Sequence, residues 1–138
     1  MGHVFEKLNL KDQAEVVVLQ APLSFEPELA WLPDRRVVRD VAEVDAVRFA
    51  LAFAYMKSEL DALSAVLVSK AEGDAILWFA YPKRTSKRYR ADFDRDRGWE
   101  VLRAGGFEPV RQVAIDADWS ALRFRRTVYV RGGQRVGA

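Results

Sequence analysis

The sequence contains no cysteine and a single histidine, and these two scarcities exclude several kinds of chemistry. Without cysteine there is no disulfide framework and no thiolate metal site. Because His3 is the sole imidazole, no histidine-based catalytic triad and no histidine metal cluster can be assembled. A chain without cysteine fits a reducing compartment, so we expect a cytoplasmic protein.

Long apolar runs are also missing. The longest uninterrupted run, at 49–56, has eight residues, whereas a membrane-spanning helix needs about 20. Residues 1–10 include Glu6 and Lys7 and contain no apolar core, so no secretory signal peptide is expected. The sequence therefore predicts a soluble protein without a membrane partner.

Charge of either sign is nearly balanced over the whole chain but unevenly distributed along it. The 138 residues carry a formal net charge of +2. Residues 1–70 have a balance of −3 and residues 71–138 a balance of +5, with the basic excess gathered at 83–97 and 123–135. Such a field attracts anions, although many inert surfaces share it.

Short apolar runs carry the prediction of secondary structure. Strands are predicted at 14–20, 36–39, 45–54, 75–80, 108–116 and 121–131, the last two forming a hairpin. At 45–54 the alternation of apolar side chains favours a strand over the helix that its alanines also permit. Helices are predicted at 25–32 with Ser24 as N-cap, around 60–67 before a stop at 72–74, and at 93–104 before Gly105 and Gly106.

Strands that alternate with helices of this length indicate right-handed crossovers and a mostly parallel sheet. We therefore expect a Rossmann-like α/β domain over residues 1–131, with helices on both faces of the sheet and an antiparallel hairpin at the C-terminal end. Residues 132–138 are expected to form a flexible tail.

Four stretches carry a resemblance to known proteins: LNLK at 8–11, VVVLQAP at 16–22, AYPKRTS at 80–86 and DADWSALRF at 116–124. On these stretches and on its element order the chain resembles a small bacterial family of methyltransferase-like proteins. The parallel sheet with its final hairpin resembles a truncated S-adenosylmethionine-dependent methyltransferase fold. The resemblance implies a fold rather than an activity.

The turn after the first strand departs from that family's pattern. Working methyltransferases have a glycine-rich turn there, because a backbone without Cβ atoms approaches the cofactor closely. Here the turn at 20–24 has no glycine, and Pro22 removes an amide donor, so we expect no cofactor. Asp40 points the other way, because an acid about 20 residues further on binds ribose hydroxyls in dinucleotide folds. If S-adenosylmethionine does bind, the candidate residues are Gln20, Ala21, Ser24 and Asp40; otherwise Asp40 is a charged strand-end residue beside Arg39.

The segment 81–90 interleaves basic residues with two tyrosines and two hydroxyls. It leaves the carboxyl end of a predicted central strand, where ligands bind in open α/β sheets. Cationic groups with hydroxyls hold phosphate or carboxylate oxygens, and alternating bases and aromatics also suit single-stranded nucleic acid. The candidate ligand- or partner-binding residues are Lys83, Arg84, Thr85, Ser86 and Lys87, with Trp119 and Ser120 from the hairpin turn. The alternatives are a solvated loop and, for Trp119, a lid over the core.

Asp92, Asp94 and Asp96 have the spacing of calcium ligands but not the rest of that motif. Position six of the loop would be Arg97 rather than glycine, and position twelve Arg103 rather than glutamate. We expect no metal, and expect these acids to cap a helix and to pair with arginines.

Three functions remain open. The first is a non-catalytic module that binds a protein partner or a small anionic ligand through the loop 83–90. The second is a small S-adenosylmethionine-dependent transferase with an atypical pocket. The third is a nucleic-acid or phosphate binder that uses the basic segments, whose affinity would fall steeply with salt. A homodimer through the edge of the hairpin is a further possibility.

Overall fold

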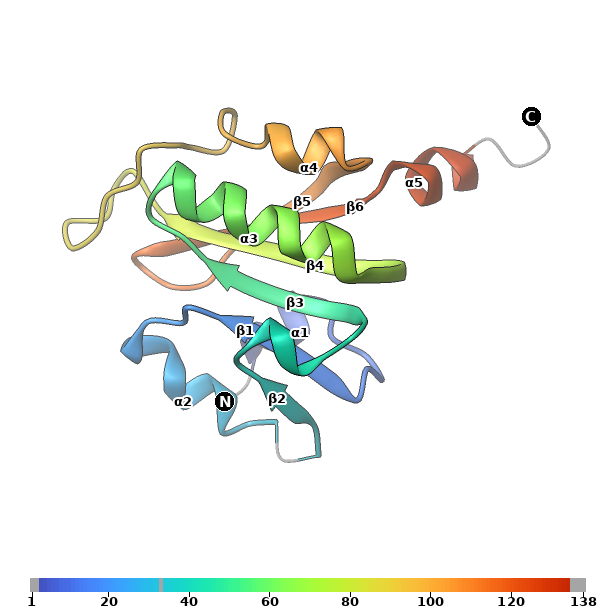
Figure 1. Cartoon of the computed structure of the whole chain (residues 1–138). Coiled ribbons are helices and arrows are strands. Elements are labelled where there is room, and N and C mark those ends of the chain that lie inside the picture. Colours follow the sequence, from blue (N-terminus) through green and yellow to red (C-terminus); the bar gives the residue numbers. More distant parts are fainter. Residues whose placement is uncertain (1–2, 33, 135–138) are drawn as a thin grey trace.

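The computed structural model describes residues 3–32 and 34–134, which form a six-stranded sheet with helices on both faces (Figure 1). The strands are β1 (Glu15–Leu19), β2 (Arg36–Val38), β3 (Val47–Phe53), β4 (Ala71–Pro82), β5 (Phe107–Ala114) and β6 (Trp119–Arg126). The helices are α1 (His3–Lys7), α2 (Glu26–Leu29), α3 (Lys57–Lys70), α4 (Glu100–Ala104) and α5 (Thr127–Gln134), with short 3-10 helices η1 (Leu23–Phe25) and η2 (Val41–Glu43).

The strand order is β2-β1-β3-β4-β6-β5. The first four strands pair in parallel, and β4 pairs antiparallel with β6, which in turn pairs antiparallel with β5. This confirms the predicted Rossmann-like fold class with its terminal hairpin. It also confirms the strand at 45–54, whose residues Val47–Phe53 form β3. The outer strand at this end of the sheet is β5. Pairing with a second copy of the chain through this edge stays a prediction.

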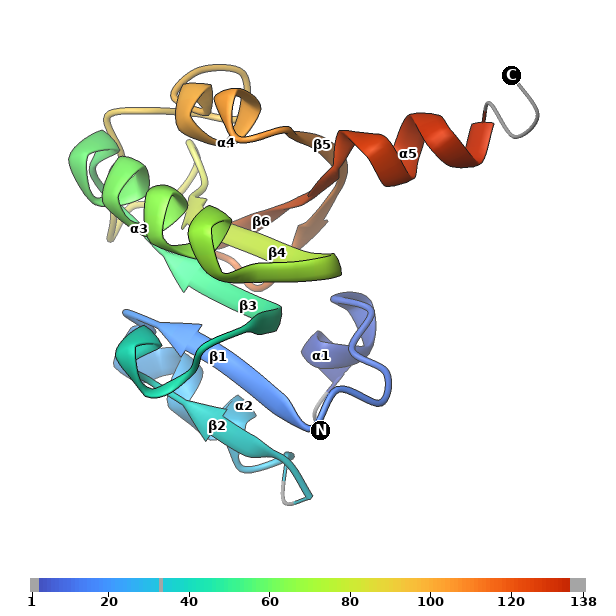
Figure 2. The same cartoon turned by 45° about the vertical axis from the view of Figure 1, so that its right-hand side comes forward.

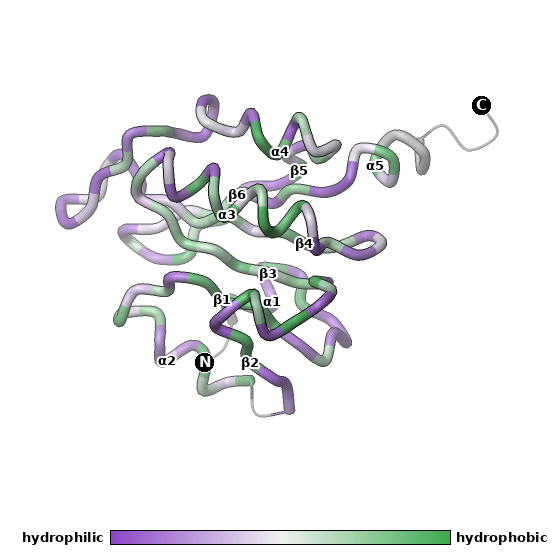
Figure 3. Tube along the Cα trace, in the orientation of Figure 1, coloured by the Kyte–Doolittle hydropathy of each residue, from purple (hydrophilic) through white to green (hydrophobic). Residues whose placement is uncertain are grey.

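Two apolar layers lie on opposite faces of the sheet (Figure 2). On one face, Leu60 and Leu67 of α3 and Leu102 of α4 belong to an apolar cluster that includes residues of the central strands β3 and β4. On the other face, α1, η1 and α2 contribute the second cluster. Along the trace, the central strand β3 is hydrophobic, while the loop that follows β4 is mostly hydrophilic (Figure 3). Burial of strand residues from both sides explains the continuous apolar runs in the sequence.

The helix α1 is fixed to the middle of the sheet. Trp78, in the central strand β4, is fully buried, and its Nε1 donates a hydrogen bond of 2.7 Å to the carbonyl of Leu8, just after α1. Phe5 of α1 contacts the rings of Phe25 and Phe49. The segment before β1 is therefore part of the core.

The predicted helix at 25–32 is shorter than expected. The chain forms the 3-10 helix η1 and then a single turn, α2. Ser24 lies inside η1, and the N-cap of that element is Pro22, so the predicted cap is wrong. Two prolines within six residues remove amide donors, which limits regular helix here.

Two helix boundaries also differ from the prediction. The helix α3 ends at Lys70, and β4 begins at once at Ala71, so the expected stop at 72–74 lies inside the strand. The helix predicted at 93–104 is reduced to α4, because the chain turns at 94–97, where Asp94 and Arg97 form an isolated bridge. Its predicted end is confirmed: Gly106 adopts a φ of +88° just after the helix.

The C-terminal end differs most. The strand predicted to continue to residue 131 ends at Arg126, and α5 follows, projecting away from the sheet (Figure 2). The tail predicted at 132–138 overlaps α5 at 132–134, and its residues 135–138 lie outside the described residues. In the described part of the chain, no helix has both the length and the apolar character needed to cross a membrane.

Candidate functional site

The carboxyl edge of the parallel strands has a reversal point between β1 and β3. Because β1 lies between β2 and β3, the chain moves to one side of β1 to form β2 and then crosses to the other side to form β3. At such a reversal the loops that leave the two strands diverge, and open α/β sheets bind their ligands there. We call residues 20–24, which leave β1 at this point, the switch-point turn.

The switch-point turn begins with a residue in the left-handed conformation. Gln20 has a φ of +59°, a region that glycine adopts without cost and other residues rarely enter. Its side chain compensates, because Nε2 donates to the carbonyl of Phe53 at 2.9 Å and lies 3.4 Å from Oε2 of Glu59. The side chain of Gln20 thus bridges the ends of β1 and β3.

Glu59 connects the same edge to α3. Its Oε1 accepts hydrogen bonds from the amides of Tyr55 and Met56, both at 3.0 Å, at the beginning of the helix. Apolar side chains stand exposed beside this polar group: Leu23 is 88% exposed after β1, and Met56 is 54% exposed after β3. The edge therefore combines a polar centre with uncovered apolar side chains.

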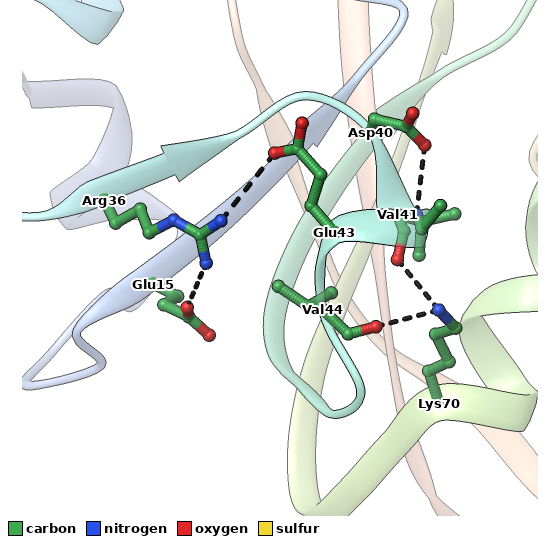
Figure 4. A network of polar contacts seen from close by, with 8 residues as sticks. Glu15, Arg36, Asp40, Val41, Glu43, Val44 and Lys70 are labelled. Atoms are coloured by element: carbon green, nitrogen blue, oxygen red, sulfur yellow. Dashed lines mark hydrogen bonds and ion pairs between the residues drawn. The ribbon is translucent and has the colours of Figure 1, made fainter.

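Asp40 follows β2 on the same edge and is exposed. Its Oδ1 accepts a hydrogen bond of 3.0 Å from the amide of Ala42, so it caps η2, and its carboxylate points away from the rest of the network in Figure 4. Lys70 holds this turn by donating to the carbonyls of Val41 and Val44 at 2.9 and 2.8 Å. The neighbouring Arg39 pairs with Glu26 rather than with Asp40.

The remaining two residues of the predicted cofactor set lie near the turn. Ala21 is half-buried and packs against the core on the face covered by α1 and α2. Ser24 is exposed and lines a small hollow with Lys7 and Asp116 on that same face. Whether these residues contact a cofactor stays a prediction.

A cleft of about 700 Å³ lies at the carboxyl end of β4 and is lined in part by the loop that follows this strand. Figure 1 shows this loop extending past the end of the sheet. We call the cavity the β4 cleft. Four cationic side chains and two carboxylates line it, together with residues of three strands: Lys83, Arg84, Arg90 and Arg95; Asp94 and Asp96; Tyr81, Gln112 and Ser120.

The floor of the β4 cleft comes from the sheet. Tyr81 and Ser120 are cross-strand partners on β4 and β6, and both are buried. Nε2 of Gln112, on β5, donates to the Tyr81 hydroxyl at 2.9 Å. Burial raises the pKa of Tyr81, opposed by the positive charge of Arg95 and assisted by nearby Asp94 and Asp96. Tyr81 is therefore a protonated donor at neutral pH.

Asp94 organises the rim of the cleft. Its Oδ1 accepts from the amides of Asp96 and Arg97 at 2.9 and 3.0 Å, and its Oδ2 pairs with Arg84 at 3.2 Å. The amide of Asp96 and then the Arg84 guanidinium lower the pKa of the Asp94 carboxyl. Asp92 instead accepts from the amide of Lys57 at 2.6 Å, at the first residue of α3. The predicted capping and pairing are therefore present, with the cap on a different helix.

The predicted ligand-binding residues divide into two groups. Lys83, Arg84, Thr85 and Ser120 line the β4 cleft, whereas Lys87 is exposed outside it. Ser86 is buried, and its hydroxyl donates to Asp118 at 2.9 Å and accepts from the amides of Arg88 and Tyr89, so it shapes the loop. Binding by these residues stays a prediction.

Trp119 was expected in a turn but is the first residue of β6. It is 1% exposed and packs against the rings of Phe53, Tyr55 and Tyr89. This agrees with the alternative of a lid over the core.

Sequence reasoning missed Arg95 and Gln112. Arg95 was visible only as a counter-ion within the aspartate motif, and Gln112 carried no signal, because its contact with Tyr81 depends on the register of the hairpin.

Two arginines of the second basic segment, Arg125 and Arg126, make structural contacts. Arg125 forms a two-point pair with Asp74 at 2.8 and 2.6 Å, and Arg126 donates to the carbonyls of Gly73 and Ala71. Among residues 3–32 and 34–134, no three side chains of the types that bind metals gather into a group.

No family model matches the sequence, and no curated protein matches it. Solved structures do share its fold. Magnesium protoporphyrin IX methyltransferase from Synechocystis PCC 6803, with bound SAH, has a TM-score of 0.59 and 12% identity over 91% of this chain and 83% of its own. A ribosomal protein L11 methylase from Lactobacillus delbrueckii subsp. bulgaricus has a TM-score of 0.55 and 13% identity, and the match covers 89% of this chain and 76% of its own. The cyclase SpnF has a TM-score of 0.51 and 12% identity, and the match covers 90% of this chain and 78% of its own.

These likenesses show that the chain has a methyltransferase-like Rossmann fold. They also correct the expectation that no cofactor binds, because the Synechocystis enzyme was solved with SAH and with SAM, which points to S-adenosylmethionine rather than to no cofactor. That expectation relied on the missing glycine, yet Gln20 adopts the left-handed backbone that glycine usually supplies.

Proposed function

We propose that this chain is a small S-adenosylmethionine-dependent transferase that binds its cofactor at the carboxyl ends of β1 and β3. The observation that carries the proposal is the left-handed turn at Gln20, located where the strand order reverses. A residue enters this conformation at a cost of roughly 1–2 kcal/mol, and such strain concentrates at binding sites.

The side chains at this edge suit the parts of the cofactor. Asp40 uses one carboxylate oxygen for its own turn. The other oxygen has no partner among the described residues and suits ribose hydroxyls. Oε1 of Gln20, which no described residue engages, and the carboxylate of Glu59 suit the ammonium group of the amino acid portion. The exposed side chain of Leu23 offers an apolar surface to the purine. When bound, the cofactor supplies a sulfonium methyl group to a nucleophilic acceptor.

The test is thermal unfolding with and without excess S-adenosylhomocysteine. A ligand at a hundred times its dissociation constant adds about 2.7 kcal/mol to the stability of the fold, which corresponds to roughly 3–6 °C for a domain of this size. We expect that shift for the native chain and a much smaller one for Asp40→Ala. The matched control is Asp45→Ala, because Asp45 is also exposed but lies at the opposite edge, just before β3. No shift at millimolar ligand would refute the proposal.

Binding alone does not establish methyl transfer, since a cyclase shares the fold. The second measurement is therefore the conversion of S-adenosylmethionine to S-adenosylhomocysteine with candidate acceptors. We also infer a cytoplasmic protein close to the small bacterial family that its sequence resembles. Both inferences rest on the sequence features given above.

A further inference from the structure

Two hydroxyl groups belong to buried residues that line the floor of the β4 cleft, and neither has an acceptor among the described residues. Ser120 is 8% exposed, and its hydroxyl makes no hydrogen bond to any described residue. Tyr81 is 5% exposed; its oxygen accepts a hydrogen bond from Gln112, and no described group accepts its proton. Both hydroxyls therefore keep a donor that a ligand in the cleft can use, and a ligand that accepts hydrogen bonds from both gains affinity here.

The rim of the cleft carries uncompensated positive charge. Arg84 is paired with Asp94, whose second contact, at 3.5 Å, is Arg97. Lys83, Arg90 and Arg95 form no ion pair with the described residues, and the sole lining carboxylate without a cation is Asp96. An anion entering the cleft therefore meets more unpaired positive than negative charge, which favours its binding.

Apolar and aromatic residues also line the cleft, namely Pro82, Tyr89 and Phe93. The volume of about 700 Å³ lies within the range of small-molecule sites, which is roughly 300–1,000 Å³. A lining that combines aromatic residues with a few polar groups suits a planar ligand with one polar end.

We propose that the β4 cleft binds a small planar ligand bearing a carboxylate or phosphate group. The anionic oxygens accept hydrogen bonds from Ser120 and Tyr81, and the rim cations neutralise the charge. This is a second ligand site, beyond the switch-point turn, and it does not depend on the cofactor. A nucleic acid would contact the exposed Lys87 and Arg88 as readily as the cleft, so variants at these two residues distinguish it from a small ligand.

The test is a titration of the isotope-labelled full chain, followed by amide chemical shifts, with benzoate, phenyl phosphate and the neutral isostere benzamide. We expect shifts around Tyr81, Arg95 and Ser120, and affinity for the anions at least about tenfold above that for benzamide. A stronger response to benzoate assigns the site to carboxylates, and a stronger response to phenyl phosphate assigns it to phosphates. Because no cofactor is added, the result is independent of the test with S-adenosylhomocysteine.

Two double variants separate the cleft from overall charge. Lys83→Gln with Arg90→Gln removes two cleft cations, and we expect affinity to fall about tenfold or more. Lys87→Gln with Arg88→Gln removes the same charge from the same loop outside the cleft, and affinity should stay within about twofold. Ser120→Ala tests the floor with little risk to folding and should weaken anion binding severalfold.

Three outcomes would overturn the proposal. The first is equal binding of benzamide and benzoate, which would remove the requirement for an anion. The second is equal weakening by the two double variants, which would show only a general charge effect. The third is binding of a single-stranded oligonucleotide without any response to the small anions, which would assign the loop to nucleic acid.

Discussion

Replacing Gln20 by alanine and by glycine separates the two contributions of this residue to stability. Both substitutions remove the hydrogen bond from Nε2 to the carbonyl of Phe53, which is part-buried and contributes about 1 kcal/mol. The contact with Glu59, at 3.4 Å and exposed, adds little. Only glycine relieves the cost of a φ of +59°, which is roughly 1–2 kcal/mol for an L-residue.

We therefore expect Gln20→Ala to lower the free energy of unfolding by about 1 kcal/mol and Gln20→Gly to leave it near that of the native chain. The assay is urea unfolding at neutral pH, supported by thermal midpoints, which should differ by roughly 3–5 °C between the two variants. Equal destabilisation by alanine and glycine would show that Gln20 does not occupy the left-handed conformation. The reasoning about the switch-point turn would then be wrong.

Two further substitutions test other parts of the fold. Hydrogen bonding from Arg125 lowers the pKa of Asp74, so the stability that this pair confers is present above the ordinary carboxyl pKa of about 3.9 and is lost as pH falls through the lowered value. Asp74→Asn should therefore lower the free energy of unfolding at neutral pH and flatten its decline between about pH 4 and pH 2, measured by urea unfolding. If the variant lost stability in acid as steeply as the native chain, the pair of Asp74 and Arg125 would not be the source of that loss. Gly98→Ala should destabilise the fold by about 2 kcal/mol or more, because the added Cβ would lie 2.8 Å from Cβ of Phe93 and the backbone has a φ of +112°. A thermal midpoint within a degree of the native value would contradict this contact.

The strands could be predicted from sequence because the sheet is buried on both faces. Val16, Val17 and Val18 form a continuous apolar run that suits only a strand covered from two sides, and β4 shows the same pattern. The helices were harder to predict. Aromatic and acidic residues at 93–99 looked like the first turns of a helix, but Phe93 and Trp99 are anchored in the core and Asp94 folds the chain into a turn.

Candidate site residues could be predicted only where the residue type and its place after a strand end were both visible in the sequence. Asp40 and the loop at 83–87 were found from their distance along the chain and their place after a strand. The left-handed conformation of Gln20 could not be predicted, because its two side-chain hydrogen bonds are made to residues distant in sequence and leave no local signal. The free hydroxyl of Ser120 depends on pairing between β4 and β6, whose partners are far apart in sequence.

The hydrogen bond between Trp78 and the carbonyl of Leu8 joins residues 70 positions apart and has a consequence for synthesis. The first helix cannot reach its place on the sheet until β4 has left the ribosome. At about 5–20 residues per second, the apolar face of α1 waits roughly 4–14 s without its partner. During that interval Phe5 and Leu8, which the finished core buries almost completely, are available to chaperones and to neighbouring nascent chains.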